Sequence, residues 1–237
     1  MIKVGCAGYP VGRDRYWRSL SFTETETGKA MPKPETLAAW RADIPGGGEA
    51  AVQAYRLVSH GPQDPGFPAA GKKLPRNRQE LCGGFRESLE VHEAWMSTKV
   101  AAEILGASIV VFDVPASFLP GADRLRDLYR FFKGIKRGNL ALVWQPRGRE
   151  WDTLADKVSG ELGLIRAFDP LRQRPPSKGR FLYLRPGLGR AGILGVDNMA
   201  TIAGACGDVP AYVALSNRNA FRDAERLKET LGSRRAR

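Results

Sequence analysis

The chain alternates between short apolar runs and longer segments with helical periodicity, and this alternation constrains its fold more than any other feature. The apolar runs are mostly continuous, which is typical of parallel strands that helices cover on both faces. Eight runs predict strands: Ile2–Cys6, Leu20–Glu26, Ala51–Ser59, Ser108–Val114, Asn139–Gln145, Gly163–Phe168, Arg180–Arg185 and Pro210–Ser216. Six segments predict helices: Glu35–Asp43, Glu87–Leu105, Ala122–Lys136, Trp151–Ser159, Asp197–Ala205 and Asn219–Leu231.

Eight strands that alternate with helices within 237 residues predict an α/β fold, a TIM-barrel-like (β/α)8 parallel barrel. We expect a single domain over residues 1–231 and a basic, frayed tail over residues 232–237. A doubly wound open sheet is the alternative, although no G-x-G-x-x-G motif follows the first strand to support a dinucleotide site. Two stretches, Gly61–Arg78 and Pro170–Arg190, interrupt the alternation and predict long loops.

The chain is strongly basic, with 37 Lys and Arg against 25 Asp and Glu and a net charge of +12. Such a balance favours polyanionic partners, nucleic acid above all, although it is also compatible with a basic surface that has no such role. The two long loops hold many of the cations. The candidate nucleic-acid contacts are Lys72, Lys73, Arg76 and Arg78 in the first loop and Arg172, Arg174 and Lys178 in the second.

The cysteines and the apolar segments suggest where the protein works. Cys6, Cys82 and Cys206 are far apart and share no C-x-x-C spacing, which argues against a disulfide framework or a zinc site. No stretch approaches the length of a membrane span, and the opening "MIKVGCAG" predicts a strand rather than a signal peptide. We therefore expect a cytoplasmic protein with no membrane partner.

Polar residues stand at the ends of seven predicted strands. In "ASIVVFDVPASF", Asp113 follows four apolar residues, and a buried carboxylate needs a partner. Because active sites of these barrels lie at the C-terminal ends of the strands, we expect the polar residues at that face, with Arg147 paired to Asp113. They are Glu24, Glu26, His60, Asp113, Gln145, Arg147, Asp169, Arg185, Ser216 and Asn217.

Several of these residues have a structural alternative. His60 and Asp169 precede Gly61 and Pro170, where they would form turns, and Asn217 would cap the last helix. Arg147 would be a solvated loop charge. Glu24 and Glu26 are two residues apart and so point to one face, which favours either acid–base chemistry or pairing with an arginine. Cys6 is expected to be a small buried residue rather than a nucleophile.

A series of motifs extends over nearly the whole chain. In order they are "VGCAGYPVGRDRYW", "WRADIP", "VQAYRLVSH", "VVFDVPASF", "WQPRGREW", "AFDP", "YLRPG" and "YVALSNRNAFRDAERL". Each is weak alone, but in this order they resemble the YecE-like family, the domain of unknown function numbered seventy-two. The resemblance implies a TIM-barrel-like fold and supplies no reaction. The matching positions with functional side chains are Glu24, His60, Arg147, Asp169, Arg185 and Asn217.

The chain also departs from the pattern of that family. Gln53 stands where the family usually has lysine, Asp113 where it has glutamine, and Gln145 where it has glutamate. Ser216 replaces the first asparagine of a pair, and Pro186 stands where the family has histidine. The loss of the lysine and the glutamate removes an acid–base or ion pair. Either Asp113 compensates for this loss, or this chain has lost the ancestral chemistry.

The first functional hypothesis is a hydrolase or related enzyme that acts on an anionic, phosphate-bearing substrate. The candidate catalytic residues are Glu24, His60 and Asp113, and the candidate substrate-binding residues are Gln145, Arg147, Asp169, Arg185 and Asn217. The arginines would clamp the anion, a carboxylate would be the general base, and His60 would be the acid near neutral pH.

The remaining hypotheses concern metals and other partners. No cofactor is expected, and two histidines are too few for a multi-histidine metal site, although a magnesium site of Glu24, Glu26 and Asp113 stays open. The alternatives to an enzyme are a non-catalytic nucleic-acid-binding barrel held by the two basic loops, and an interaction scaffold whose pocket chemistry is lost.

Overall fold

The computed structural model describes residues 1–176, 179–188 and 192–235, and its strands form a closed barrel in chain order. β1 pairs in parallel with β8, from Ile2 opposite Ala211 to Cys6 opposite Leu215, and this pairing closes the barrel. The predicted parallel barrel is therefore confirmed, and the open-sheet alternative is wrong. The strands are β1 (Ile2–Ala7), β2 (Phe22–Thr25), β3 (Glu49–Gln53), β4 (Ile109–Asp113), β5 (Ala141–Gln145), β6 (Ile165–Phe168), β7 (Leu182–Leu184) and β8 (Ala211–Leu215).

Helices lie between most consecutive strands, and the six predicted ones are present. The α-helices are α1 (Arg13–Ser19), α2 (Pro34–Asp43), α3 (Ala69–Lys72), α4 (Arg76–Gln79), α5 (Leu89–Leu105), α6 (Ala122–Gly134), α7 (Ala155–Leu162), α8 (Val196–Cys206) and α9 (Ala220–Arg235). Two 3-10 helices are η1 (Arg56–Val58) and η2 (Arg149–Trp151). α5 has clear end signals, because the Ser88 hydroxyl accepts a hydrogen bond from the Val91 N–H and Gly106 follows the helix with a φ of 63°.

Several boundaries and elements differ from the prediction. β3 ends at Gln53, six residues earlier than expected, because the chain turns into η1 and buries Leu57 and Val58 there instead of in a strand. The first long loop contains the short helices α3 and α4, and α1 was not predicted. At the C-terminus, α9 continues to Arg235, so four residues of the expected tail are helical.

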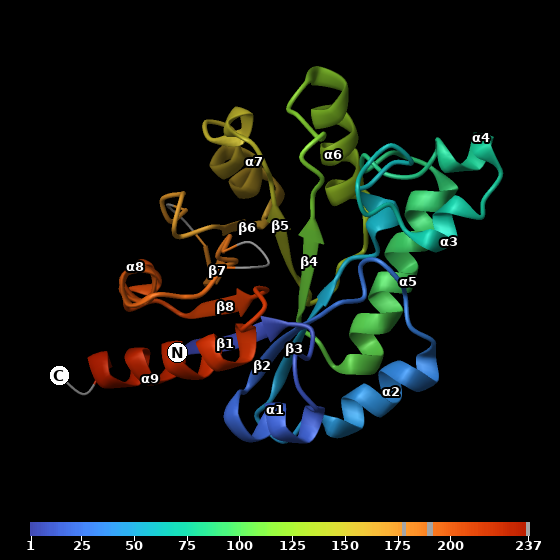
Figure 1. The fold of residues 1–237 in the computed structure, drawn as a ribbon. Helices are drawn as coiled ribbons and strands as arrows, with labels where there is room; N and C mark the ends of the chain where they lie inside the picture. Colours follow the sequence, from blue (N-terminus) through green and yellow to red (C-terminus); the bar gives the residue numbers. More distant parts are fainter. Residues whose placement is uncertain (177–178, 189–191, 236–237) are drawn as a thin grey trace. The chain divides into compact units, whose positions relative to one another are not determined.

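The chain divides into two compact units, each with its own hydrophobic core. The first unit comprises Met1–Thr25, Ala42–Ala50 and Ala167–Arg237, and in it α9 packs against β1 and β8 (Figure 1). The Tyr16 hydroxyl on α1 donates to the Phe22 carbonyl (2.6 Å) and accepts from the Cys6 N–H (2.7 Å). These bonds fix α1 against the first two strands. The single domain over residues 1–231 stays a prediction.

The second unit comprises Glu26–Arg41 and Ala51–Arg166, and its core is centred on Phe112 of β4. Phe112 is fully buried and stacks on Trp95 of α5 with 6.0 Å between ring centroids. Its ring also meets Phe132 of α6 at 5.1 Å in an edge contact. β4 is therefore held between aromatic side chains of α5 and α6, and this packing fixes the position of Asp113 at the end of the strand.

Candidate functional site

In the second unit, two arginines converge on the carboxylate of Asp113. Asp113 is 6% exposed and is the last residue of β4. The Arg147 Nη2 lies 2.6 Å from one carboxylate oxygen, and the Arg56 Nη2 lies 2.5 Å from the other. The expected pairing of Asp113 with Arg147 is confirmed, whereas the sequence did not identify Arg56. Two guanidinium groups offset the cost of burying this carboxylate.

The local chain geometry explains how these groups meet. Asp113 stands opposite Gln145, the last residue of β5, and Arg147 follows two residues later. Arg56 comes from η1, and the Ser59 hydroxyl beyond η1 donates to the Asp113 carbonyl (2.9 Å). A Cβ at Gly66 would lie 2.4 Å from Nη1 of Arg56, so glycine lets that loop approach the guanidinium.

His60 is buried beside this cluster and is neutral at neutral pH. It is 3% exposed, and its Nδ1 lies 2.9 Å from the Ser59 hydroxyl. Burial and the nearby Arg56 charge lower its pKa from 6.5 to about 4, although Asp113 and Asp64 oppose this shift. This lowered pKa disfavours the imidazolium form near neutral pH, and the role of His60 as an acid there stays a prediction.

A cavity of about 340 Å³ opens next to Ser59 in the same unit. Its lining includes Asp64, which accepts a hydrogen bond from the Gly61 N–H (2.8 Å) and one from the Ser117 hydroxyl. Arg86 and Arg124 add two cations to the wall. The cavity therefore combines hydroxyl groups with charges of both signs.

In the first unit, Glu24 of β2 is fully buried and both of its oxygens accept hydrogen bonds. Arg185, just beyond β7, donates to Oε1 (2.9 Å), and the Tyr183 hydroxyl donates to Oε2 (2.8 Å). Burial, and then the Glu24 charge, raise the pKa of Tyr183 well above its ordinary value. This is the arginine pairing that the sequence left open for Glu24. Glu26 is exposed beyond the end of β2, so the expected pair of carboxylates on one face is wrong.

The side chains of Asp169 and Asn217 form hydrogen bonds with backbone atoms of the first unit. The Asp169 carboxylate accepts from the Leu171 N–H (3.0 Å), and the Asn217 amide donates to the Gly192 carbonyl (2.8 Å). The same Asn217 amide donates to Asp223 on α9 (2.8 Å). The Asp169 contact matches the turn alternative. The Asn217 Oδ1 accepts no hydrogen bond among the described residues, so the capping alternative for Asn217 is not supported. The expected contact of both residues with substrate stays a prediction.

The basic loops lie in different units, and their cations differ in accessibility. In the first loop Lys72, Lys73 and Arg76 are exposed. Arg78 is bound to the buried Glu90 (2.7 Å), and this hydrogen bond lowers the pKa of Glu90. Its expected role as a nucleic-acid contact is therefore weakened. In the second loop Arg172 and Arg174 are exposed, Arg172 lies 3.6 Å from Asp169, and Lys178 lies outside the described residues.

The described part of the chain contains no group of three or more His, Cys, Asp and Glu side chains that could hold a metal ion. The magnesium alternative consisted of Glu24, Glu26 and Asp113. The carboxylates of Glu24 and Asp113 are paired with guanidinium groups. None of the helices over residues 1–176, 179–188 and 192–235 is long and apolar enough to cross a membrane. Cys6 is fully buried, and burial raises its pKa to about 12, as expected of a core residue.

Comparison with known proteins identifies the fold. No protein-family model and no curated protein matches the sequence. Among solved structures, a DUF72 family protein from Enterococcus faecalis matches with a TM-score of 0.73 and 13% identity, over 98% of both chains. A DUF72 family protein from Thermotoga maritima matches with a TM-score of 0.72 and 14% identity, over 98% of this chain and 99% of that one.

A third solved structure matches with a lower TM-score. Endonuclease IV from Thermus thermophilus has a TM-score of 0.52 and 13% identity, over 98% of both chains. The family resemblance inferred from the ordered motifs therefore agrees with the structural match to the two DUF72 family proteins. This chain has the TIM-barrel fold of the DUF72 family proteins.

Proposed function

We propose that the chain is a divergent DUF72, YecE-like protein that binds a small phosphate-bearing anion through Arg147. The observation that carries this proposal is the position of Arg147, whose side chain is 47% exposed while Asp113 fixes one side of its guanidinium. Arg56 and Arg147 supply two positive charges against the single negative charge of Asp113. A guanidinium that is fixed and still accessible is suited to forked hydrogen bonds with phosphate oxygens.

The reaction we propose is hydrolysis of a phosphoester at the C-terminal ends of β4 and β5. Arg147 would stabilise charge that develops on the phosphoryl oxygens, which is the main contribution that proteins make to phosphoryl transfer. Gln145 stands opposite Asp113 in the sheet register and is a candidate for orienting the substrate. Water would attack the phosphorus, and the bond from phosphorus to the leaving oxygen would break. The attacking water would release its proton to solvent, and the leaving oxygen would take one from solvent, while neutral His60 forms hydrogen bonds without changing its charge.

The experiment is a binding titration with inorganic phosphate, followed by an assay with nitrophenyl phosphate. Arg147→Met removes the guanidinium that is proposed to bind phosphate, and Arg56 still pairs with Asp113 in this variant. The matched control is Arg149→Met, an exposed arginine two residues further along the chain. We expect Arg147→Met to weaken phosphate binding by roughly tenfold or more, and the control to leave it unchanged. Equal affinities in the two variants would remove the basis of the proposal.

Nucleic-acid binding is the second candidate, supported by the net charge of +12 and by the exposed Lys72, Lys73 and Arg76. Neutralising these three cations should reduce the log–log salt dependence of oligonucleotide binding by roughly 2 to 3. Arg172 and Arg174 are tested in a separate variant, because they belong to the other unit. Binding that does not depend on salt would contradict this candidate. A cytoplasmic location and the oligomeric state stay outside both tests.

A further inference from the structure

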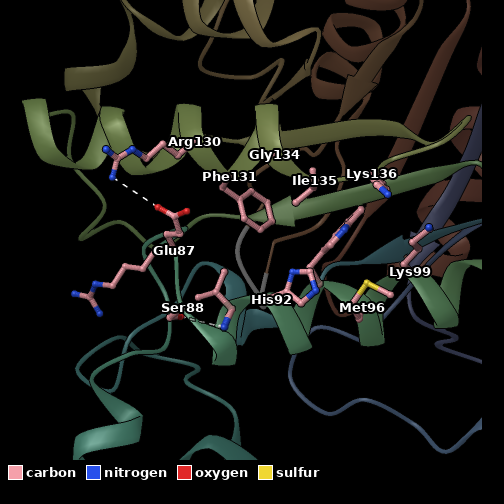
Figure 2. Close-up of a pocket in the computed structure, with 13 residues that line it drawn as sticks. Glu87, Ser88, His92, Met96, Lys99, Arg130, Phe131, Gly134, Ile135 and Lys136 are labelled. Carbon is pink, nitrogen blue, oxygen red and sulfur yellow. Dashed lines mark hydrogen bonds and ion pairs between the residues drawn. The ribbon is translucent and has the colours of Figure 1, made fainter.

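One face of α5 is separated from α6 by a cavity of about 500 Å³ (Figure 2). The α5 residues recur every three or four positions, which places them on a single side of the helix. From α5 and its N-terminal cap they are Ser88, Val91, His92, Trp95, Met96 and Lys99. From α6 they are Arg130, Phe131 and Gly134. The volume lies within the range of small-molecule sites.

The floor of this cavity is apolar and rigid. Val91 and Trp95 are each 1% exposed, and Phe131 is 8% exposed. Trp95 stacks on Phe112 at 6.0 Å and meets Phe131 edge-on at 6.2 Å, so neighbouring rings fix its orientation. Met96, at 43% exposed, adds a polarisable apolar side chain at the surface. Such a floor favours a ring or short aliphatic body.

The rim of the cavity is cationic. Its described lining residues include Arg86, Lys99, Arg130 and Lys136, against one carboxylate, Glu87. Glu87 pairs with Arg130 at 3.7 Å. Figure 2 shows this pair toward one end of the cavity and Lys99 and Lys136 toward the other. The charge at the lysine end therefore favours an anionic group.

Gly134 lines the cavity and contributes no side chain to it. It is the last residue of α6, and a Cβ built on it meets no other atom within 4 Å, apart from the neighbouring backbone of its own helix. Its φ is not in the left-handed region, so a larger side chain is compatible with the backbone. A side chain at this position would therefore enter open space at the cavity that Gly134 lines.

We infer that this cavity binds a small amphipathic anion, with an apolar body against Trp95 and Phe131 and one carboxylate, sulfonate or phosphate group at Lys99 and Lys136. The inference does not depend on the proposed phosphate site, because Arg147 and Asp113 are not among the lining residues.

The test uses the full chain and two fluorescent probes, anilinonaphthalene sulfonate and its uncharged relative phenylnaphthylamine. We expect saturable, one-to-one binding of the sulfonate to the native protein. Gly134→Leu should fill the hollow and weaken binding of both probes at least tenfold. The matched control is Gly160→Leu, an exposed helical glycine of α7 whose Cβ would also meet open space, and it should change neither affinity.

Charge is tested separately from shape. The double variant Lys99→Met with Lys136→Met should weaken binding of the sulfonate roughly tenfold and leave the uncharged probe unaffected. Lys29→Met with Lys33→Met makes the same change in net charge at two exposed lysines elsewhere and should alter the binding of neither probe. The inference is overturned if the sulfonate does not saturate, if Gly134→Leu and Gly160→Leu behave alike, or if both double variants weaken sulfonate binding equally.

Discussion

In the variant His60→Asn, the free energy of unfolding should fall less as the pH falls than it does in the native protein. His60 is 3% exposed, and burial with the Arg56 charge lowers its pKa from 6.5 to about 4. Unfolding returns the imidazole to water and restores its ordinary pKa, so the unfolded chain binds the proton first as the pH falls. Neutral His60 therefore contributes stability that is fully present above pH 6.5 and is lost as the pH falls toward 4.

The magnitude follows from the difference between the two pKa values. One pKa unit corresponds to about 1.36 kcal/mol, so the complete loss is ~3 kcal/mol, of which ~2 kcal/mol falls between about pH 7.5 and about pH 5. Asparagine does not titrate, and its amide can replace the contact between the His60 Nδ1 and the Ser59 hydroxyl. Over this interval the free energy of unfolding should fall by ~2 kcal/mol less in the variant than in the native protein.

Urea denaturation at several pH values measures this difference. The control is His92→Asn, at the other histidine of the chain, which is exposed. It should keep the native pH dependence because His60 is intact. If the unfolding free energies of the native protein and His60→Asn run parallel from neutral pH to about pH 5, the buried, neutral state assigned to His60 is refuted.

Three further predictions concern stability. Gly5→Ala places a Cβ 2.0 Å from a backbone oxygen of the facing strand and should cost about 3 kcal/mol or more of unfolding free energy, measured in urea. Tyr183→Phe removes the hydroxyl that donates to Glu24 and should cost about 2 kcal/mol by the same measurement. Asp113→Asn leaves the largely buried Arg56 without its ionic partner and should cost about 3 kcal/mol, so a neutral result would contradict the ion-pair geometry.

The barrel was predictable because its signal is repeated. Each strand and helix adds an apolar run or a helical period, and errors at single boundaries do not change the count. The end of β3 was not predictable, since Leu57 and Val58 are as apolar in η1 as they would be in a strand. α1 was missed because it is short and mostly polar, with Tyr16 as its buried residue.

The candidate site was partly predictable for a related reason. The rule that polar residues collect at the ends of parallel strands identified Asp113 and Arg147 correctly as partners. Arg56 was hidden within a segment predicted to be a strand, and its charge adds to burial in lowering the pKa of His60. Tyr183 lies within a predicted strand and is buried, but its hydroxyl contact with Glu24 depends on a three-dimensional arrangement that spacing does not encode.

The replacement at position 113 bears on how the proposed site would bind an anion. In the family that the sequence resembles, this position carries a neutral glutamine, whereas here it carries a carboxylate between Arg56 and Arg147. A carboxylate at this place orients the Arg147 guanidinium before any ligand arrives, and it also neutralises part of the charge that would attract the ligand. A phosphate would therefore contact the side of the Arg147 guanidinium that faces away from Asp113, and the Asp113 carboxylate would repel it. This repulsion would favour phosphoesters that direct their oxygens to Arg147 over compact, fully charged anions. If so, Asp113→Asn should increase the affinity for inorganic phosphate even as it lowers the stability of the fold.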